Sequence, residues 1–127
     1  MKTIISTPKA PSAIGPYNQA TAFDKLIFTS GQIALDPATM EIVSGGVQEQ
    51  TKQVMENLKA VLEEAGSSFE NVLKTTCYLS DMDNFVAFNE IYAQYFKGET
   101  APARSTVAVK TLPKNVLVEV DTIAFKN

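Results

Sequence analysis

The sequence predicts an α+β domain of two layers, in which two helices cover one face of a single β-sheet. Three observations lead to this fold class. Two segments have the apolar period of an amphipathic helix, shorter segments are rich in β-branched and aromatic residues, and the two kinds alternate along 127 residues. No linker, internal repeat or charge block interrupts the chain, so we expect one domain over residues 1–127.

Two helices are predicted, over residues 47–65 and 84–97. In the first, apolar residues recur every three or four positions, charged residues occupy the opposite face, and Gly66 follows as a stop signal. In the second, aromatic and aliphatic residues are expected to face inward, and Gly98 follows the segment. Both helices are long enough to cover a sheet.

Strands are predicted where β-branched and aromatic residues are concentrated, in segments 18–23, 26–32, 72–79, 105–109 and 116–125. The first two are expected to form a hairpin across the turn at Asp24-Lys25. The element order is then β-β-(β)-α-β-α-β-β, which is compatible with both helices on one side of the sheet.

Segment 72–79 bears on assembly, because neither of its alternating sets of side chains is clearly polar. One predicted set is Leu73, Thr75, Cys77 and Leu79, and the other is Val72, Lys74, Thr76 and Tyr78. Two helices can cover only one side of the sheet, so a semi-apolar second face favours burial against another subunit. The alternative is a face of Thr and Tyr in contact with solvent. We expect an oligomer.

The composition excludes several kinds of catalytic site. There is no His, which removes Ser-His-Asp and Cys-His arrangements and every histidine-ligated metal site. Cys77 is the only Cys, which excludes an internal disulfide and a Cys-x-x-Cys site. Acid–base chemistry would therefore use a carboxylate, a Lys, a Tyr or the single thiol. We expect no metal and no other cofactor.

The charge balance argues against nucleic acid as a partner. The formal net charge is −3 and the pI is about 4.9, and the Lys residues are scattered rather than gathered in a basic stripe. No apolar run approaches the ~20 residues of a membrane span. The N-terminus also lacks the long apolar core of a secretory signal. We expect a cytoplasmic protein without a membrane partner.

Arg104 is the only Arg among eleven basic residues. A bias towards Lys explains the other ten, and Lys would serve wherever only a positive charge is needed. Arg differs in its planar fork, which binds a carboxylate or phosphate through two parallel hydrogen bonds. A ligand-binding role for Arg104 is the favoured interpretation, and a surface salt bridge is the alternative.

Glu119 interrupts the apolar run 116–120 on a strand that is expected to be central. A carboxylate there needs partners or a cleft, because a buried, unpaired charge is costly, and burial raises its pKa towards the range of a general base. The alternative is that Glu119 lies on a solvent-exposed face beside Asp121. The residues alone leave both interpretations open.

Three further residues are binding candidates by position. Ser30 and Gly31 end a strand, where a glycine would allow a ligand to approach the backbone, although a plain turn or bulge is equally consistent with it. Tyr17 follows a Gly-Pro turn, where an isolated Tyr is more often a packing residue than a functional one.

Seven short motifs follow one another along essentially the whole chain. They are Ala13-Ile14-Gly15-Pro16-Tyr17, Thr29-Ser30-Gly31-Gln32-Ile33, Asn57-Leu58, Asn89-x-x-Tyr92-x-x-Tyr95-Phe96, Pro102-Ala103-Arg104-Ser105, Leu112-Pro113 and Val118-Glu119-Val120. Each motif alone is weak, but the ordered set resembles the RidA (YjgF) family of enamine/imine deaminases.

The resemblance implies a chorismate-mutase-like α+β fold, with a single mixed sheet, in a homotrimer with three clefts between subunits. It also implies hydrolysis of 2-iminopropanoate and 2-iminobutanoate to 2-keto acids and ammonia, without a cofactor. By position, Arg104 would bind the substrate carboxylate and Glu119 would hold the attacking water. The implied substrate-binding or supporting residues are Tyr17, Ser30, Gly31, Asn89 and Thr106.

One position departs from the family pattern. Many members have Cys two residues after the Arg, where this chain has Thr106, and Cys77 lies elsewhere in the sequence. Thiol-based regulation proposed for relatives is therefore not expected here.

Two other functions stay open. Some relatives resemble translation inhibitors with ribonuclease activity, but the acidic balance, the single Arg and the absence of His argue against an RNA substrate. A non-catalytic trimer that binds metabolites is the other alternative. The presence of both Arg104 and Glu119 favours catalysis, because a carboxylate binder would need only the Arg.

Overall fold

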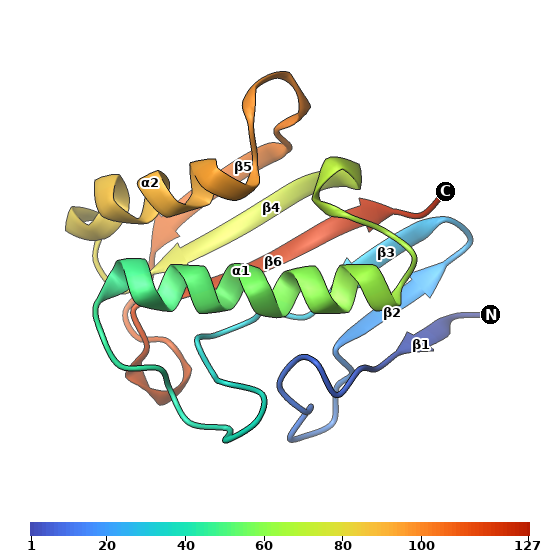
Figure 1. Ribbon diagram of the computed structural model, residues 1–127, viewed down its shortest axis with the longest axis horizontal. Helices are drawn as coiled ribbons and strands as arrows, with labels where there is room; N and C mark the ends of the chain where they lie inside the picture. Colours follow the sequence, from blue (N-terminus) through green and yellow to red (C-terminus); the bar gives the residue numbers. More distant parts are fainter.

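The computed structural model describes residues 1–127, which form a six-stranded sheet and two α-helices. In chain order the elements are β1 (Thr3–Ile5), β2 (Ala20–Phe23), β3 (Leu26–Thr29), α1 (Val47–Glu64), β4 (Val72–Leu79), α2 (Phe85–Tyr95), β5 (Ala103–Ala108) and β6 (Val118–Phe125). Both chain ends lie at the same end of the molecule (Figure 1).

The strand order in the sheet is β1-β2-β3-β6-β4-β5. All neighbours are antiparallel except β4 and β5, which are parallel because α2 forms the crossover between them. The sheet is therefore mixed. The last strand along the sequence, β6, pairs with β3 on one side and β4 on the other (Figure 1).

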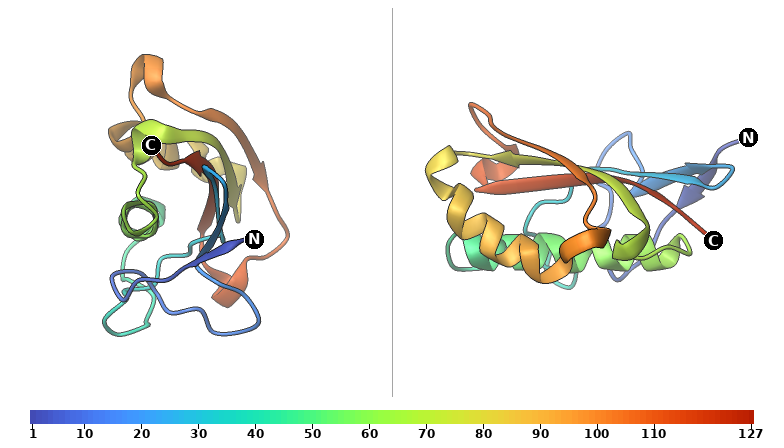
Figure 2. Two further views of the ribbon diagram at one scale, coloured as in Figure 1. Left: turned by 90° about the vertical axis from the view of Figure 1, so that its right-hand side faces the viewer. Right: turned by 90° about the horizontal axis from the view of Figure 1, so that it is seen from above.

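Both helices pack on the same face of the sheet (Figure 2). The core lies between the helices and the sheet and consists of buried apolar side chains from both layers. Its fully buried members include Leu58 and Leu62 of α1, Phe88 of α2, and Val118 and Val120 of β6. This confirms the α+β fold class with a single mixed sheet covered on one face by two helices. No helix is long and apolar enough to cross a membrane.

The helix bounds agree closely with the sequence pattern. At the start of α1, the Glu49 carboxylate accepts a hydrogen bond of 2.8 Å from the Gly46 backbone N–H. Beyond its end, Gly66 has a φ of 82°, a left-handed conformation that glycine adopts without the cost a β-carbon would add. The predicted stop at Gly66 is confirmed.

The structure has one strand that was not expected, β1, and several strand bounds differ from the prediction. β2 begins at Ala20 rather than at residue 18, and β3 ends at Thr29 rather than at residue 32. β5 covers Ala103–Ala108 rather than 105–109, and β6 begins at Val118 rather than at residue 116. Beyond Thr29 the regular ladder ends: the Ser30 N–H still bonds to the Gln19 carbonyl on the β2 side, and Gln32 forms an isolated bridge with Val120 on the β6 side.

A β-bulge at the start of β4 corrects the predicted faces of this strand. The register against β6 shifts between Val72 and Lys74, so Val72 is buried and Leu73 is 47% exposed. The prediction that Leu73 shares a face with Thr75 and Cys77 is therefore wrong. From Lys74 onward the alternation is as predicted, with Thr75 and Cys77 buried.

Candidate active site

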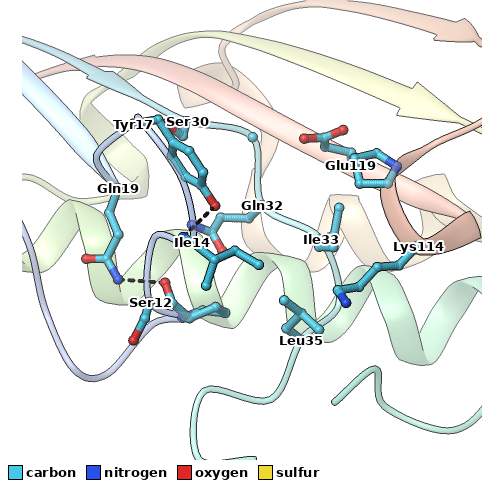
Figure 3. A pocket seen from close by; sticks show the side chains of 13 residues that line it. Ser12, Ile14, Tyr17, Gln19, Ser30, Gln32, Ile33, Leu35, Lys114 and Glu119 are labelled. Carbon is cyan, nitrogen blue, oxygen red and sulfur yellow. Dashed lines mark hydrogen bonds between the residues drawn. The ribbon is translucent and has the colours of Figure 1, made fainter. Parts of the chain in front are cut away.

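A cavity of about 450 Å³ lies beside the end of β3 and the start of β6. Its walls come from three parts of the chain: the segment before β2, the segment after β3, and the turn that leads into β6. The lining residues are Pro11, Ser12, Ile14, Tyr17, Gln19, Ser30, Gly31, Gln32, Ile33, Leu35, Pro113, Lys114 and Glu119. Figure 3 shows Glu119, Lys114 and Ile33 on one side of the cavity, and Tyr17 and Ile14 on the other.

Glu119 projects from the face of the sheet opposite the helices. Its neighbours Val118 and Val120 are fully buried on the helix side, and side chains alternate along a strand. Burial, and secondarily the charge of Asp121, raise the pKa of the half-buried Glu119 carboxyl above its ordinary value. Each of the two interpretations of Glu119 therefore describes part of its environment: it shares a solvent-facing side of β6 with Asp121, and it also lines a cavity.

Gly31 packs directly against Glu119. A β-carbon at Gly31 would lie 2.8 Å from Cδ of Glu119 and closer still to Oε2. Only a residue without a side chain leaves the carboxylate in this position, so the glycine is explained by a close approach.

Ser30 and Tyr17 complete the same region. The Ser30 hydroxyl donates a hydrogen bond of 2.6 Å to the backbone carbonyl of Asn18, which orients it. The Tyr17 hydroxyl accepts a long hydrogen bond of 3.5 Å from the Ile14 N–H, and its ring stays 48% exposed in the cavity wall. Four predicted site residues, Tyr17, Ser30, Gly31 and Glu119, are therefore brought together.

Arg104 lies elsewhere, on β5 under helix α2. Its guanidinium carbon lies 4.6 Å from the ring centroid of Tyr92 and 5.4 Å from that of Phe85. Its Nη1 donates a hydrogen bond of 2.7 Å to Oδ1 of Asn89. These partners are uncharged, so Arg104 keeps its positive charge available, and Asn89 and Arg104 form a second group of predicted site residues.

Thr106 follows Arg104 on the same face of β5. Its hydroxyl oxygen is buried without a hydrogen-bond partner. In the β4–β5 ladder it lies directly opposite Cys77, so the only thiol is far from Thr106 in sequence but next to it in the sheet. Burial raises the pKa of the Cys77 thiol to about 11.

The two charged residues of the predicted site do not meet within one chain. Arg104 lies on the helix side of the sheet, because its ladder partner Thr75 is buried and bonds to Tyr92 of α2. Glu119 lies on the opposite side. One copy of the chain therefore holds the predicted site residues in two separate groups.

Sequence reasoning missed several residues of the cavity, notably Lys114. This residue has a left-handed backbone with a φ of 56°, in the turn Pro113–Asn115 that leads into β6. The Leu112-Pro113 motif was the available signal, but it did not indicate that the following side chain would line the cavity. No cluster of three or more His, Cys, Asp or Glu side chains suitable for a metal ion is present.

Comparison with known proteins assigns the family. A family model described as Endoribonuclease L-PSP matches residues 7–126. The chain belongs to this family, which is the RidA (YjgF) family. Among its RidA relatives is a RutC family protein of Pyrococcus abyssi, 54% identical over 98% of this chain and 98% of its own.

Two other relatives carry more specific descriptions. A human protein named 2-iminobutanoate/2-iminopropanoate deaminase is 47% identical, over 99% of this chain and 91% of its own. The crystal structure of YyfA from Yersinia pestis, described as a member of the conserved Rid protein family, superposes with a TM-score of 0.95. It is 46% identical and covers 98% of this chain and 99% of its own.

Proposed function

We propose that this RidA-family protein hydrolyses the C=N bond of reactive 2-imino acids, including 2-iminopropanoate and 2-iminobutanoate, to 2-keto acids and ammonia. The observation that carries the proposal is the environment of Glu119. Its carboxylate lines a cavity beside Gly31, and burial and Asp121 raise its pKa. A carboxyl group with a raised pKa is a more effective base near neutral pH. The name of the human relative supports the same activity.

The chemistry requires few groups. A protonated imine is already electrophilic, so its carbon accepts water without further polarisation. Glu119 takes a proton from the attacking water as the new C–O bond forms, and gives this proton to the nitrogen of the tetrahedral intermediate. The C–N bond then breaks as the hydroxyl proton passes back to Glu119. The products are a 2-keto acid and ammonia, which leaves with that proton as ammonium.

Arg104 supplies the second requirement, which is a group that binds the substrate carboxylate. Its guanidinium fork suits two parallel hydrogen bonds to a carboxylate, and the rings of Tyr92 and Phe85 together with Asn89 fix its orientation. Holding the substrate at both its carboxylate and its reacting carbon accounts for much of the rate acceleration needed.

We further propose that the active site forms between copies of the chain in a homotrimer. Arg104 and Glu119 lie on opposite faces of one sheet, so a substrate that contacts both must lie between two chains. The two surfaces differ, and such head-to-tail contacts form a ring when the rotation between neighbouring copies closes. The exposed edge strand β5 and the exposed apolar side chains Phe23, Leu26 and Phe28 of the outer face are available for this contact. The number three rests on the family resemblance.

Subunit mixing tests the shared site. We expect Arg104→Ala and Glu119→Gln each to lose 2-ketobutyrate release from freshly generated 2-iminobutanoate. When the two variants are dissociated, mixed and reassociated, about a quarter of the sites combine an intact Arg with an intact Glu, so about a quarter of the wild-type activity should return. Mixed oligomers without recovered activity would contradict the shared site. A fully active monomer in light scattering would contradict the trimer.

The two alternative functions give different results in the same preparation. A non-catalytic binder would bind 2-ketobutyrate through Arg104 but would hydrolyse no imine. A ribonuclease would cleave RNA with a strong dependence on salt, and the cleavage would persist through further purification. The net charge of −3 and the lack of His make this second outcome the less expected one.

A further inference from the structure

We propose that Gln19 is a positioning residue of the candidate active site, because its buried side chain holds the segment that forms one wall of the cavity. The kinetic part of this inference rests on the proposed function. The Gln19 side chain is only 3% exposed. Its Oε1 accepts a hydrogen bond of 2.7 Å from the Thr7 N–H, and its Nε2 lies 3.0, 3.2 and 2.7 Å from the carbonyl oxygens of Thr7, Ala10 and Pro11.

The segment between β1 and β2 needs such a partner. It forms neither helix nor strand over residues 6–19, and three of its residues are Pro, which have no N–H to donate. Ala10 and Pro11 are nevertheless buried, and a buried carbonyl oxygen without a donor is costly. The Gln19 amide supplies hydrogen bonds to both of these carbonyls.

The same segment forms a wall of the cavity. Pro11, Ser12, Ile14 and Tyr17 all line it, and Figure 3 shows Gln19 bonded at the base of this wall. The position of this wall therefore depends on a side chain that lies across the cavity from Glu119.

Gln19 also connects this wall to the end of β3, which leads to Gly31. Its backbone carbonyl accepts a hydrogen bond of 2.9 Å from the Ser30 N–H, one residue before the glycine that packs against Glu119. The side chain of Gln19 thus holds one wall of the cavity, and its main chain holds the end of β3 beside Glu119, the proposed general base. One residue therefore ties the wall segment to the part of the chain that leads to Gly31 and Glu119.

Kinetic constants of two variants test this role. Gln19→Met keeps the length of the side chain but removes all four hydrogen bonds. Gln19→Glu keeps the shape and one acceptor but cannot donate to the carbonyls when ionised. Wall contacts act in the ground state and the transition state alike, so we expect the KM for 2-iminobutanoate to rise about tenfold in both variants, with a smaller change in kcat.

A matched substitution serves as the control. Gln48 is on α1, where its amide donates to the carbonyl of Ala87 and to Glu90, away from the cavity. Gln48→Met should leave the KM unchanged. A purely stabilising role for Gln19 would lower the unfolding midpoint of its variants without changing the KM of the folded protein, and this result would overturn the proposal. A wild-type KM in Gln19→Glu would also overturn it, by showing that shape alone is sufficient.

Hydrogen exchange on the wild-type protein keeps the proposal testable if the variants fail to fold. The Thr7 N–H is bonded to Gln19 in a segment without regular structure, so we expect its exchange to be slow in comparison with the exposed Ala13 N–H in the same segment. Equal, fast exchange at both sites would overturn the proposal. This measurement does not depend on turnover, so it separates a failure of Gln19 positioning from a failure of the proposed function.

Discussion

The side chain of Glu119 occupies the space that a β-carbon at Gly31 would need, so the position of the carboxylate depends on the absence of a side chain there. The backbone of Gly31 is not left-handed, and an alanine can adopt it without strain. We expect Gly31→Ala to fold but to displace the Glu119 carboxylate. A displacement of about 1 Å in a reacting group lowers turnover about a hundredfold. Single-turnover hydrolysis of 2-iminobutanoate measures the effect.

The control for this variant is Gly46→Ala. A β-carbon at Gly46 would have its nearest neighbour at 3.8 Å, and Gly46 does not line the cavity. Activity should be retained. Wild-type turnover in Gly31→Ala would show that the carboxylate can move without consequence.

Glu119→Gln separates a catalyst from a binder. The substitution is nearly isosteric but removes the charge that accepts a proton from water, so turnover should fall about a hundredfold to ten-thousandfold. Binding of 2-ketobutyrate should persist, because it depends on Arg104. Calorimetry measures the binding, and an unchanged rate of hydrolysis would place the base elsewhere.

The same variant should change the dependence of stability on pH. The pKa of Glu119 is raised in the folded protein above its ordinary value of 4.5, so the folded state binds this proton more tightly than the unfolded state. As the pH rises from 4.5, the ordinary pKa, to the raised pKa of the folded protein, the free energy of unfolding of the wild type falls. The loss is complete above the folded-state pKa.

Glu119→Gln has no titrating carboxyl at this position, so its free energy of unfolding does not fall in this way as the pH rises. We therefore expect the variant to be more stable than the wild type at pH 7, and the difference to shrink as the pH falls towards 4.5. Urea unfolding at a series of pH values measures it. A difference that is constant with pH would show that the carboxyl has an unperturbed pKa.

Arg104→Lys should keep the fold and lose most of the activity. Lys retains the charge but not the two-bond geometry, and the loss of one charge-assisted hydrogen bond costs about 1.5–3 kcal/mol, roughly a tenfold to hundredfold effect. The hydrogen bond to Asn89 and the contact with Tyr92 would also change. Near-normal turnover, measured together with 2-ketobutyrate affinity, would exclude Arg104 from the site.

Cys77 should be unreactive in the folded protein. The side chain is fully buried and its pKa is about 11, so almost no thiolate is present near neutral pH. Alkylation by iodoacetamide should therefore be negligible in buffer and complete in denaturant, as followed by mass spectrometry. Fast labelling of the native protein would mean that β4 and β5 open readily next to Thr106.

The sequence predicted those features that depend on local pattern. The period of apolar residues and the glycine after it place α1 within one residue of its end. The isolation of Arg104 and the interruption of an apolar strand by Glu119 single out the two charged residues that are proposed for the site. Features that depend on strand pairing were not accessible. The bulge at Val72 exists only in the register against β6, and β1 is a three-residue edge strand whose partner follows at some distance.

The placement of Arg104 and Glu119 on opposite faces of the sheet was not accessible from the sequence for the same reason. Which face of the sheet carries Arg104, and which carries Glu119, depends on the parallel register of β5 and the antiparallel register of β6. Gln19 and Lys114 were missed because their environment is created by segments that are remote in sequence. Period and spacing carry no information about such contacts.

The central place of β6 constrains how the protein reaches its native state. Leu26 of β3 pairs with Phe125 of β6, so this part of the sheet forms only when most of the chain, from residue 26 to residue 125, is closed into a loop. Pairing of this kind makes folding slow in comparison with helical proteins of the same size. Until residues 118–125 leave the ribosome, β3 and β4 each lack a neighbour and present an open edge to other nascent chains. The rate of synthesis and the temperature during expression should therefore affect the yield of this protein more than its final stability suggests.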